Sequence, residues 1–80
     1  MTKTQAAIVI REAIKQAARE CDVKPSEAFN PPTQHRPAIA ARNIAIRLAH
    51  DQGLPTHILA DAFQRDRKTI TNALLVTKPD

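Results

Sequence analysis

A group of cationic, amide and hydroxyl side chains is concentrated near the C-terminal end of the sequence. Its members are Arg65, Asp66, Arg67, Lys68, Thr69, Thr71 and Asn72. Arginine donates paired hydrogen bonds to guanine, asparagine pairs with adenine, and threonine contacts the methyl group of thymine. Such side chains at the start of a helix are suited to base edges in a major groove. A capped helix with surface cations is also an ordinary solvated face, so the residue types alone leave both interpretations open.

Two short helices are predicted to position this group. Thr56 is a good N-cap for a helix ending near Phe63, and Asp66 is a good N-cap for a helix from Arg67 to about Thr77. The tight turn of three residues between them, 64–66, gives a helix-turn-helix pattern. The apolar residues of the two helices are Ile58, Leu59, Ala62, Phe63, Ile70, Ala73 and Leu74.

The spacing of side chains in these two helices predicts how they pack. Small Ala60 would let the helices cross closely, and Phe63 and Ile70 would fill the wedge between them. The polar group would then lie on the opposite, exposed face of the second helix.

Three more helices are predicted upstream. The first begins near Thr4, its expected N-cap, and ends at Cys21; a short helix begins at Pro25; a long helix runs from Pro37 to about His50. Apolar residues recur at steps of three and four in both long helices. The residues expected to be buried are Ala7, Ile10, Ile14, Ala17 and Cys21 in the first helix, and Ile39, Ala41, Ile44, Ala45, Leu48 and Ala49 in the long helix.

The connections between these helices also carry recognisable signals. Val23 and Phe29 are expected to pack the short helix onto the first helix. Residues 30–36 are polar and proline-rich and read as a loop, and Gly53 is expected to be a left-handed C-cap. The sequence therefore predicts an all-α fold of five helices in a single domain, residues 1–80.

Composition excludes several classes of function. A chain of 80 residues with 42% hydrophobic content supports one small domain and has no room for separate catalytic and binding domains. One glycine excludes a glycine-rich phosphate loop, and two Phe with no Trp or Tyr argue against stacking of single-stranded bases. The longest apolar stretch near the N-terminus, residues 6–10, is too short for a membrane span or a signal peptide. A single cysteine, Cys21, excludes an intrachain disulfide framework and fits a reducing compartment.

Catalytic and metal sites are not expected. Asp61 and Asp66 could be an acid and base pair, but no nucleophile accompanies them. The possible metal ligands match no zinc spacing and are Cys21, His35, His50 and His57. We therefore expect no enzyme activity, no metal and no cofactor.

The positive charge is unevenly distributed along the chain. The net charge is +4 and the isoelectric point is about 9.9. Residues 1–34 contain five basic and four acidic residues, whereas residues 35–80 contain seven basic and four acidic residues. No acidic residue occurs between Glu27 and Asp51, a stretch that contains Arg36, Arg42 and Arg47. The excess charge therefore accompanies the helix-turn-helix pattern, as expected of a nucleic-acid footprint.

Two stretches resemble one known family. Ala-Arg-Asn-Ile-Ala-Ile-Arg-Leu, residues 41–48, is similar to the Ala-Arg-Gln-Ile-Ala-Met-x-Leu pattern of the C-terminal DNA-binding domain of the bacterial replication initiator DnaA. Phe-Gln-Arg-Asp-Arg-Lys-Thr-Ile, residues 63–70, is similar to the Phe-Gly-Arg-Asp-His-Thr-Thr-Val signature of that domain. The lead-in at residues 23–29 resembles the short second helix of the family. The resemblance implies an all-helical domain with a Trp-repressor-like helix-turn-helix.

The resemblance also implies roles for particular residues. The arginine matching Arg42 reaches into the minor groove in that family, and the run matching residues 65–69 works in the major groove. Arg67 and Lys68 replace the family's His and first Thr, and the basic loop is reduced to residues 31–36. We therefore expect a target sequence that differs from the usual initiator box.

The expected function is sequence-specific binding of double-stranded DNA by a stand-alone bacterial or phage regulator of transcription, in the cytoplasm at the nucleoid. The expected DNA-binding residues are Arg36, Arg42, Arg47, Arg65, Asp66, Arg67, Lys68, Thr69, Thr71 and Asn72. No nucleotide-binding motif is present for origin melting, but binding of initiator sites to modulate replication stays open. A third possibility is a protein-interaction module, or a homodimer, because exposure of Ile8 or Val9 would leave an apolar patch on the first helix.

Overall fold

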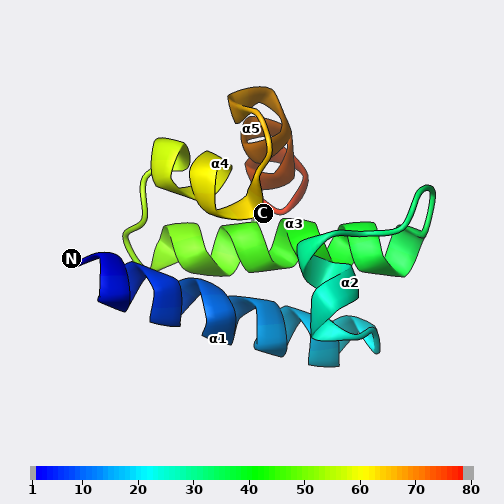
Figure 1. Cartoon of the computed structure of the whole chain (residues 1–80). Coiled ribbons are helices and arrows are strands. Elements are labelled where there is room, and N and C mark those ends of the chain that lie inside the picture. The colour runs from blue at the N-terminus through cyan, green and yellow to red at the C-terminus, as the bar shows by residue number, and fades with distance from the viewer. Residues whose placement is uncertain (1, 79–80) are drawn as a thin grey trace.

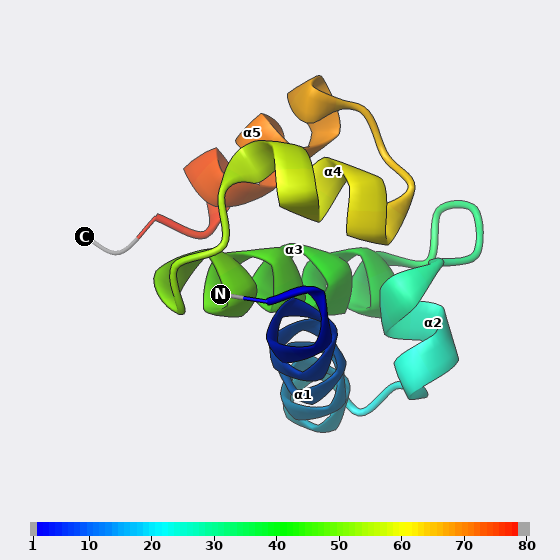
Figure 2. The ribbon, with the colours of Figure 1, turned by 60° about the vertical axis from the view of Figure 1, so that its left-hand side comes forward.

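The structure, a computed structural model, describes residues 2–78, and five α-helices make up that part of the chain, as the sequence predicts. They are α1 (Lys3–Cys21), α2 (Pro25–Phe29), α3 (Arg36–Asp51), α4 (Thr56–Phe63) and α5 (Arg67–Val76). The central helix is α3, which contacts each of the other four. Helix α1 crosses one side of α3, with α2 packed against both, while α4 and α5 lie on the opposite side (Figure 1, Figure 2). None of the helices in residues 2–78 is both long and apolar enough to cross a membrane.

The first helix begins two residues earlier than the sequence predicts. Its N-cap is Thr2, not Thr4. Thr2 Oγ1 accepts a hydrogen bond from the backbone N–H of Gln5 (3.2 Å), and Gln5 Oε1 accepts one from the backbone N–H of Thr2 (2.9 Å). This reciprocal capping box satisfies two free N–H groups. At α4 the expected N-cap, Thr56, is instead the first helical residue and Pro55 precedes it.

Small side chains dominate the centre of the fold. Of the fourteen buried hydrophobic residues between positions 2 and 78, nine are alanines. In α1 the buried residues are Ala13, Ala17 and Ala18. In α3 they are Ala38, Ala41, Ala45, Ile46 and Ala49. Because alanine lets two helix backbones approach closely, larger residues such as Ile14 and Leu48 lie at the margin and are only partly buried.

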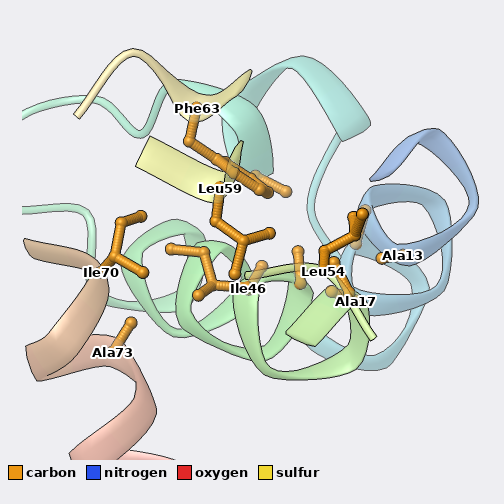
Figure 3. Close-up of a cluster of buried hydrophobic side chains, with 13 residues drawn as sticks. Ala13, Ala17, Ile46, Leu54, Leu59, Phe63, Ile70 and Ala73 are labelled. Atoms are coloured by element: carbon orange, nitrogen blue, oxygen red, sulfur yellow. The ribbon is translucent and has the colours of Figure 1, made fainter. Parts of the chain in front are cut away.

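These positions correct part of the expected core. Ala7 is exposed, and Ile10 and Cys21 are only partly buried, whereas Ala13 and Ala18 are fully enclosed without having been expected to be. The buried face of α1 is thus centred on its alanines and not on the larger apolar residues that the sequence pattern favours. A second group of larger side chains, Ile46, Leu59, Phe63 and Ile70, fills the space between α3, α4 and α5 (Figure 3).

Two connections shape the ends of α3. The loop before it, residues 30–35, projects beyond the helices (Figure 1, Figure 2) and contains Gln34 in the left-handed region at φ 62°. After it, Gly53 has φ 106°, a conformation that suits glycine, and its N–H donates to the carbonyl of His50 (2.9 Å). The positive φ expected of Gly53 is confirmed, but the C-cap itself is Gln52 in the right-handed α conformation, and Gly53 follows it.

Candidate nucleic-acid interface

The turn between α4 and α5 is fixed by its own backbone. Gln64 ends α4 in the left-handed conformation at φ 55°, and the N–H of Arg65 donates to the carbonyl of Ala60 (3.0 Å). Asp66 is then extended and caps α5, since its Oδ1 accepts from the backbone N–H of Thr69 (2.9 Å). The predicted cap at Asp66 is confirmed. Hydrogen bonds from Thr69 lower the pKa of Asp66. The larger contribution comes from the Thr69 side chain and the smaller one from its backbone N–H.

The buried sides of α4 and α5 hold both helices on α3. Phe63 and Ile70 are 1% and 0% exposed, and they share one apolar cluster with Ile46 of α3 (Figure 3). Ala60 is partly buried against the same cluster. Phe63 and Ile70 are therefore buried between the helices, as the sequence predicts. Their packing fixes which face of α5 points outward.

The outward face of α5 carries the polar group that the sequence singles out. Arg67, Lys68, Thr71 and Asn72 are exposed, and Thr69 is partly buried. The carboxylate within this stretch, Asp66, is engaged in the cap. The first turns of α5 therefore present two free cations and several hydrogen-bonding groups to solvent.

Arg65 links the turn to the other side of the fold. Its Nη2 donates to Asn30 Oδ1 (3.1 Å), just after α2. Beneath this contact the rings of Phe29 and Phe63 stack with centroids 6.0 Å apart. The sequence predicts that Phe29 packs α2 onto α1; α2 does contact α1, and the ring of Phe29 in addition stacks on Phe63 of α4. Asn30 is a positioning residue that carried no signal in the sequence.

Arg42 lies in a seam between α3 and α5. Its Nη2 donates to Asn43 Oδ1 (3.2 Å), while its Nε is enclosed and has no hydrogen-bond partner. Burial and, to a smaller degree, the nearby charge of Arg65 lower the pKa of Arg42. The structure therefore brings Arg42 to the edge of the α5 face, beside Thr69 and Asn72.

The other two arginines of α3 are placed differently. Arg36 is exposed at the first position of α3, next to the projecting loop. Arg47 Nε donates to Thr77 Oγ1 (3.3 Å), its Nη2 donates to the carbonyl of Leu74, and its Nη1 lies 3.5 Å from Asp51 Oδ1. These contacts hold the C-terminal end of α5, where a cation is favoured. Arg47 is thus engaged in contacts within the fold, and its expected contact with DNA stays a prediction.

An apolar groove runs along the other side of α4. It lies between α4 and the N-terminal half of α1, has a volume of about 640 Å³ and includes Ile10 and Ile58 in its lining. Ile8 is outside the lining of this groove and is 46% exposed, whereas Val9 packs against the core. Of the two residues that the sequence offers for an apolar patch, the structure therefore selects Ile8.

The fold and the surface together define a small all-α protein of five helices with a cationic face on its last helix. Comparison of the chain with models of protein families, with curated proteins and with solved structures gave no match. The resemblance to the C-terminal domain of the replication initiator rests on the sequence motifs alone.

Proposed function

We propose that the chain binds double-stranded DNA in a sequence-specific manner, with α4 and α5 as a helix-turn-helix and α5 as its recognition helix. The observation that carries this proposal is that α5 has one buried apolar face and one exposed polar face. Ile70 and Ala73 are buried on α3, while Arg67, Lys68 and Thr71 are exposed on the first turns. A helix fixed in this way offers its N-terminal residues to the major groove without rearrangement.

The proposed biological role is regulation of transcription. The motifs at residues 41–48 and 63–70 support a Trp-repressor-like domain related to that of the initiator, acting at the bacterial or phage nucleoid. Arg67 and Lys68 favour guanine or phosphate over the groups that the family's His and Thr would contact. A target other than the usual initiator box follows from this difference.

The proposal is tested by a binding selection from random duplexes, followed by measurement of affinity for the selected site and for a random duplex. Arg67→Ala should cost about 1–3 kcal/mol on the selected site and much less on the random duplex. Arg19→Ala, an exposed arginine in the last turn of α1, is the matched control and should leave both affinities unchanged. Failure to enrich any sequence, or enrichment of the usual initiator box, would contradict the proposed specificity.

A second candidate function is self-association through the groove between α1 and α4. Lys3 and Asp61 both line this groove, so it carries both signs of charge and suits the same surface of a second copy related by a two-fold axis. Ala7, an exposed residue of α1, lies in its lining. A dimer of this kind would present two copies of α5 to paired half-sites.

Sedimentation of the free protein tests self-association. The wild type should sediment as a dimer, and Ala7→Asp should sediment as a monomer because a charge enters the apolar contact. Gln16→Asp introduces the same charge at an exposed position farther along α1 and should stay dimeric. A monomeric wild type would rule out this contact.

A further inference from the structure

The seam between α3 and α5 contains a hollow of about 220 Å³. Its lining is formed by Arg42, Asn43, Thr69, Asn72, Ala73 and Val76. Four of these side chains are polar and none is acidic. The hollow therefore combines a positive charge with hydrogen-bonding groups at a point where two helices meet.

Arg42 is incompletely satisfied in this position. Its Nε is enclosed without a hydrogen-bond partner, and its Nη2 is bound only to the neutral oxygen of Asn43. Arg47, on the same helix, is by contrast paired with Asp51 and bonded to Leu74 of α5 and to Thr77, which caps the end of α5. In residues 2–78 no acidic side chain is paired with Arg42, so its charge is uncompensated and an incoming anion would gain a charge-assisted hydrogen bond from the guanidinium.

The chemistry of the lining selects the kind of anion. A planar guanidinium suits the oxygens of a phosphate group, and Asn and Thr side chains are frequent secondary donors to the DNA backbone. Thr69 and Asn72 also belong to the first turns of α5, beside the face that we assign to the major groove. A backbone phosphate at the edge of that groove would lie against this seam.

We propose that the hollow formed by Arg42, Thr69 and Asn72 binds one phosphodiester group of the DNA backbone. This inference rests on the proposed function and assigns one contact of the bound DNA, a backbone phosphate, to this hollow. It divides the polar residues into two sets: these three fix the register of the protein on the duplex, while Arg67, Lys68 and Thr71 contact bases. It also gives Arg42 a role other than insertion into the minor groove.

Salt dependence of duplex binding tests the proposal, with Arg42→Met and Arg42→Lys compared with the wild type. Loss of one phosphate contact should reduce the slope of log affinity against log salt by about 0.9 for Arg42→Met. Its affinity should fall by the same factor on the selected site and on a random duplex. Arg42→Lys keeps the charge but loses the planar fork, so it should keep the slope and lose part of the affinity. Arg19→Met is the matched control and should behave as the wild type.

A neutral methylphosphonate, placed at one backbone position at a time, locates the contact. We expect one position at which the substitution weakens binding by the wild type and has no further effect on Arg42→Met. If Arg42→Met does not fold, Arg42→Gln, which also lacks the charge but is polar, replaces it in the scan.

Two results would overturn the inference in distinguishable ways. An unchanged salt slope for Arg42→Met, or a loss confined to the selected site, would exclude the phosphate contact while leaving DNA binding intact. Absence of duplex binding by the wild type would overturn the proposed function and the phosphate site together.

Discussion

Arg42 and Arg47 are alike in sequence context, since both are arginines of α3 within the motif at residues 41–48. Their surroundings separate them. Arg47 is paired with Asp51 and with acceptors at the end of α5, whereas the Nε of Arg42 has no partner. The first arginine therefore keeps an uncompensated charge, whereas the second is paired within the fold.

At the same scale, Asp66 gives a prediction about pH. Its pKa is lowered from the ordinary value of 3.8 by the hydrogen bonds of Thr69. A carboxylate with a lowered pKa stabilises the folded state above its unfolded pKa, and this contribution is lost as the pH falls through the folded pKa. Asp66→Ala should therefore lower the melting temperature near neutral pH, and the difference from wild type should shrink below about pH 4.

Thermal melts followed by circular dichroism over this pH range make the measurement. Asp66→Asn is the first control, because asparagine is also a good N-cap but does not titrate. Asp61→Ala removes an exposed carboxylate from α4 without touching the cap and should show no such convergence. A difference between wild type and Asp66→Ala that is constant with pH would contradict the role of the charged cap.

At the scale of the elements, the fold depends on how closely its helices approach. The buried residues of α1 are all alanines, and most of those of α3 are alanines as well. Small side chains leave little room for adjustment, because protein interiors are close-packed. The position of α3 thus depends on buried side chains that carry no functional group. Because α4 and α5 pack on α3, their positions depend on the same side chains.

Ala45→Leu tests this dependence. Ala45 is 0% exposed in α3, so the added carbons should cost about 1–3 kcal/mol of unfolding free energy. Ala40→Leu makes the same change at an exposed position of the same helix and should have little effect, because alanine and leucine have similar helix propensities. Urea denaturation of the three proteins gives the comparison. Equal stability of Ala45→Leu and wild type would show that the core tolerates a wider helix separation.

At the scale of the whole molecule, α3 separates two surfaces. The groove between α1 and α4 is mainly apolar, and the α5 face with its neighbouring seam is cationic. Most of the net charge of +4 comes from residues 35–80. The excess charge is therefore not spread evenly over the protein, which is the pattern that favours contact with a polyanion.

Duplex affinity should consequently be strongly dependent on salt. With about six phosphate contacts, the association constant should fall by about three decades between 50 and 200 mM salt. Fluorescence anisotropy titrations over this range provide the measurement, and circular dichroism at each salt concentration checks that the fold is unchanged. Affinity that does not respond to salt would count against DNA binding and in favour of a protein partner.

Much of this arrangement could be predicted from local signals. The Asp66 cap, the left-handed glycine at Gly53 and the wedge residues Phe63 and Ile70 all follow from patterns within a few residues. The features that were missed are those that such local patterns do not determine. Thr2 and Thr4 are both acceptable caps, and the reciprocal bonds with Gln5 decide between them. The contact of Phe29 with Phe63 joins segments far apart in the chain, so no local pattern predicts it.

The sequence by itself determined the five helices, the exposed cationic start of α5 and the concentration of charge in the second half of the chain. These properties depend on periodicity, capping and composition, which act over one or two helical turns. Only the tertiary structure decided which arginine of α3 is free and which is held, and that Thr69 and Asn72 share a hollow with Arg42. Those distinctions depend on how α5 crosses α3, and that crossing is set by the packing of buried side chains from both helices.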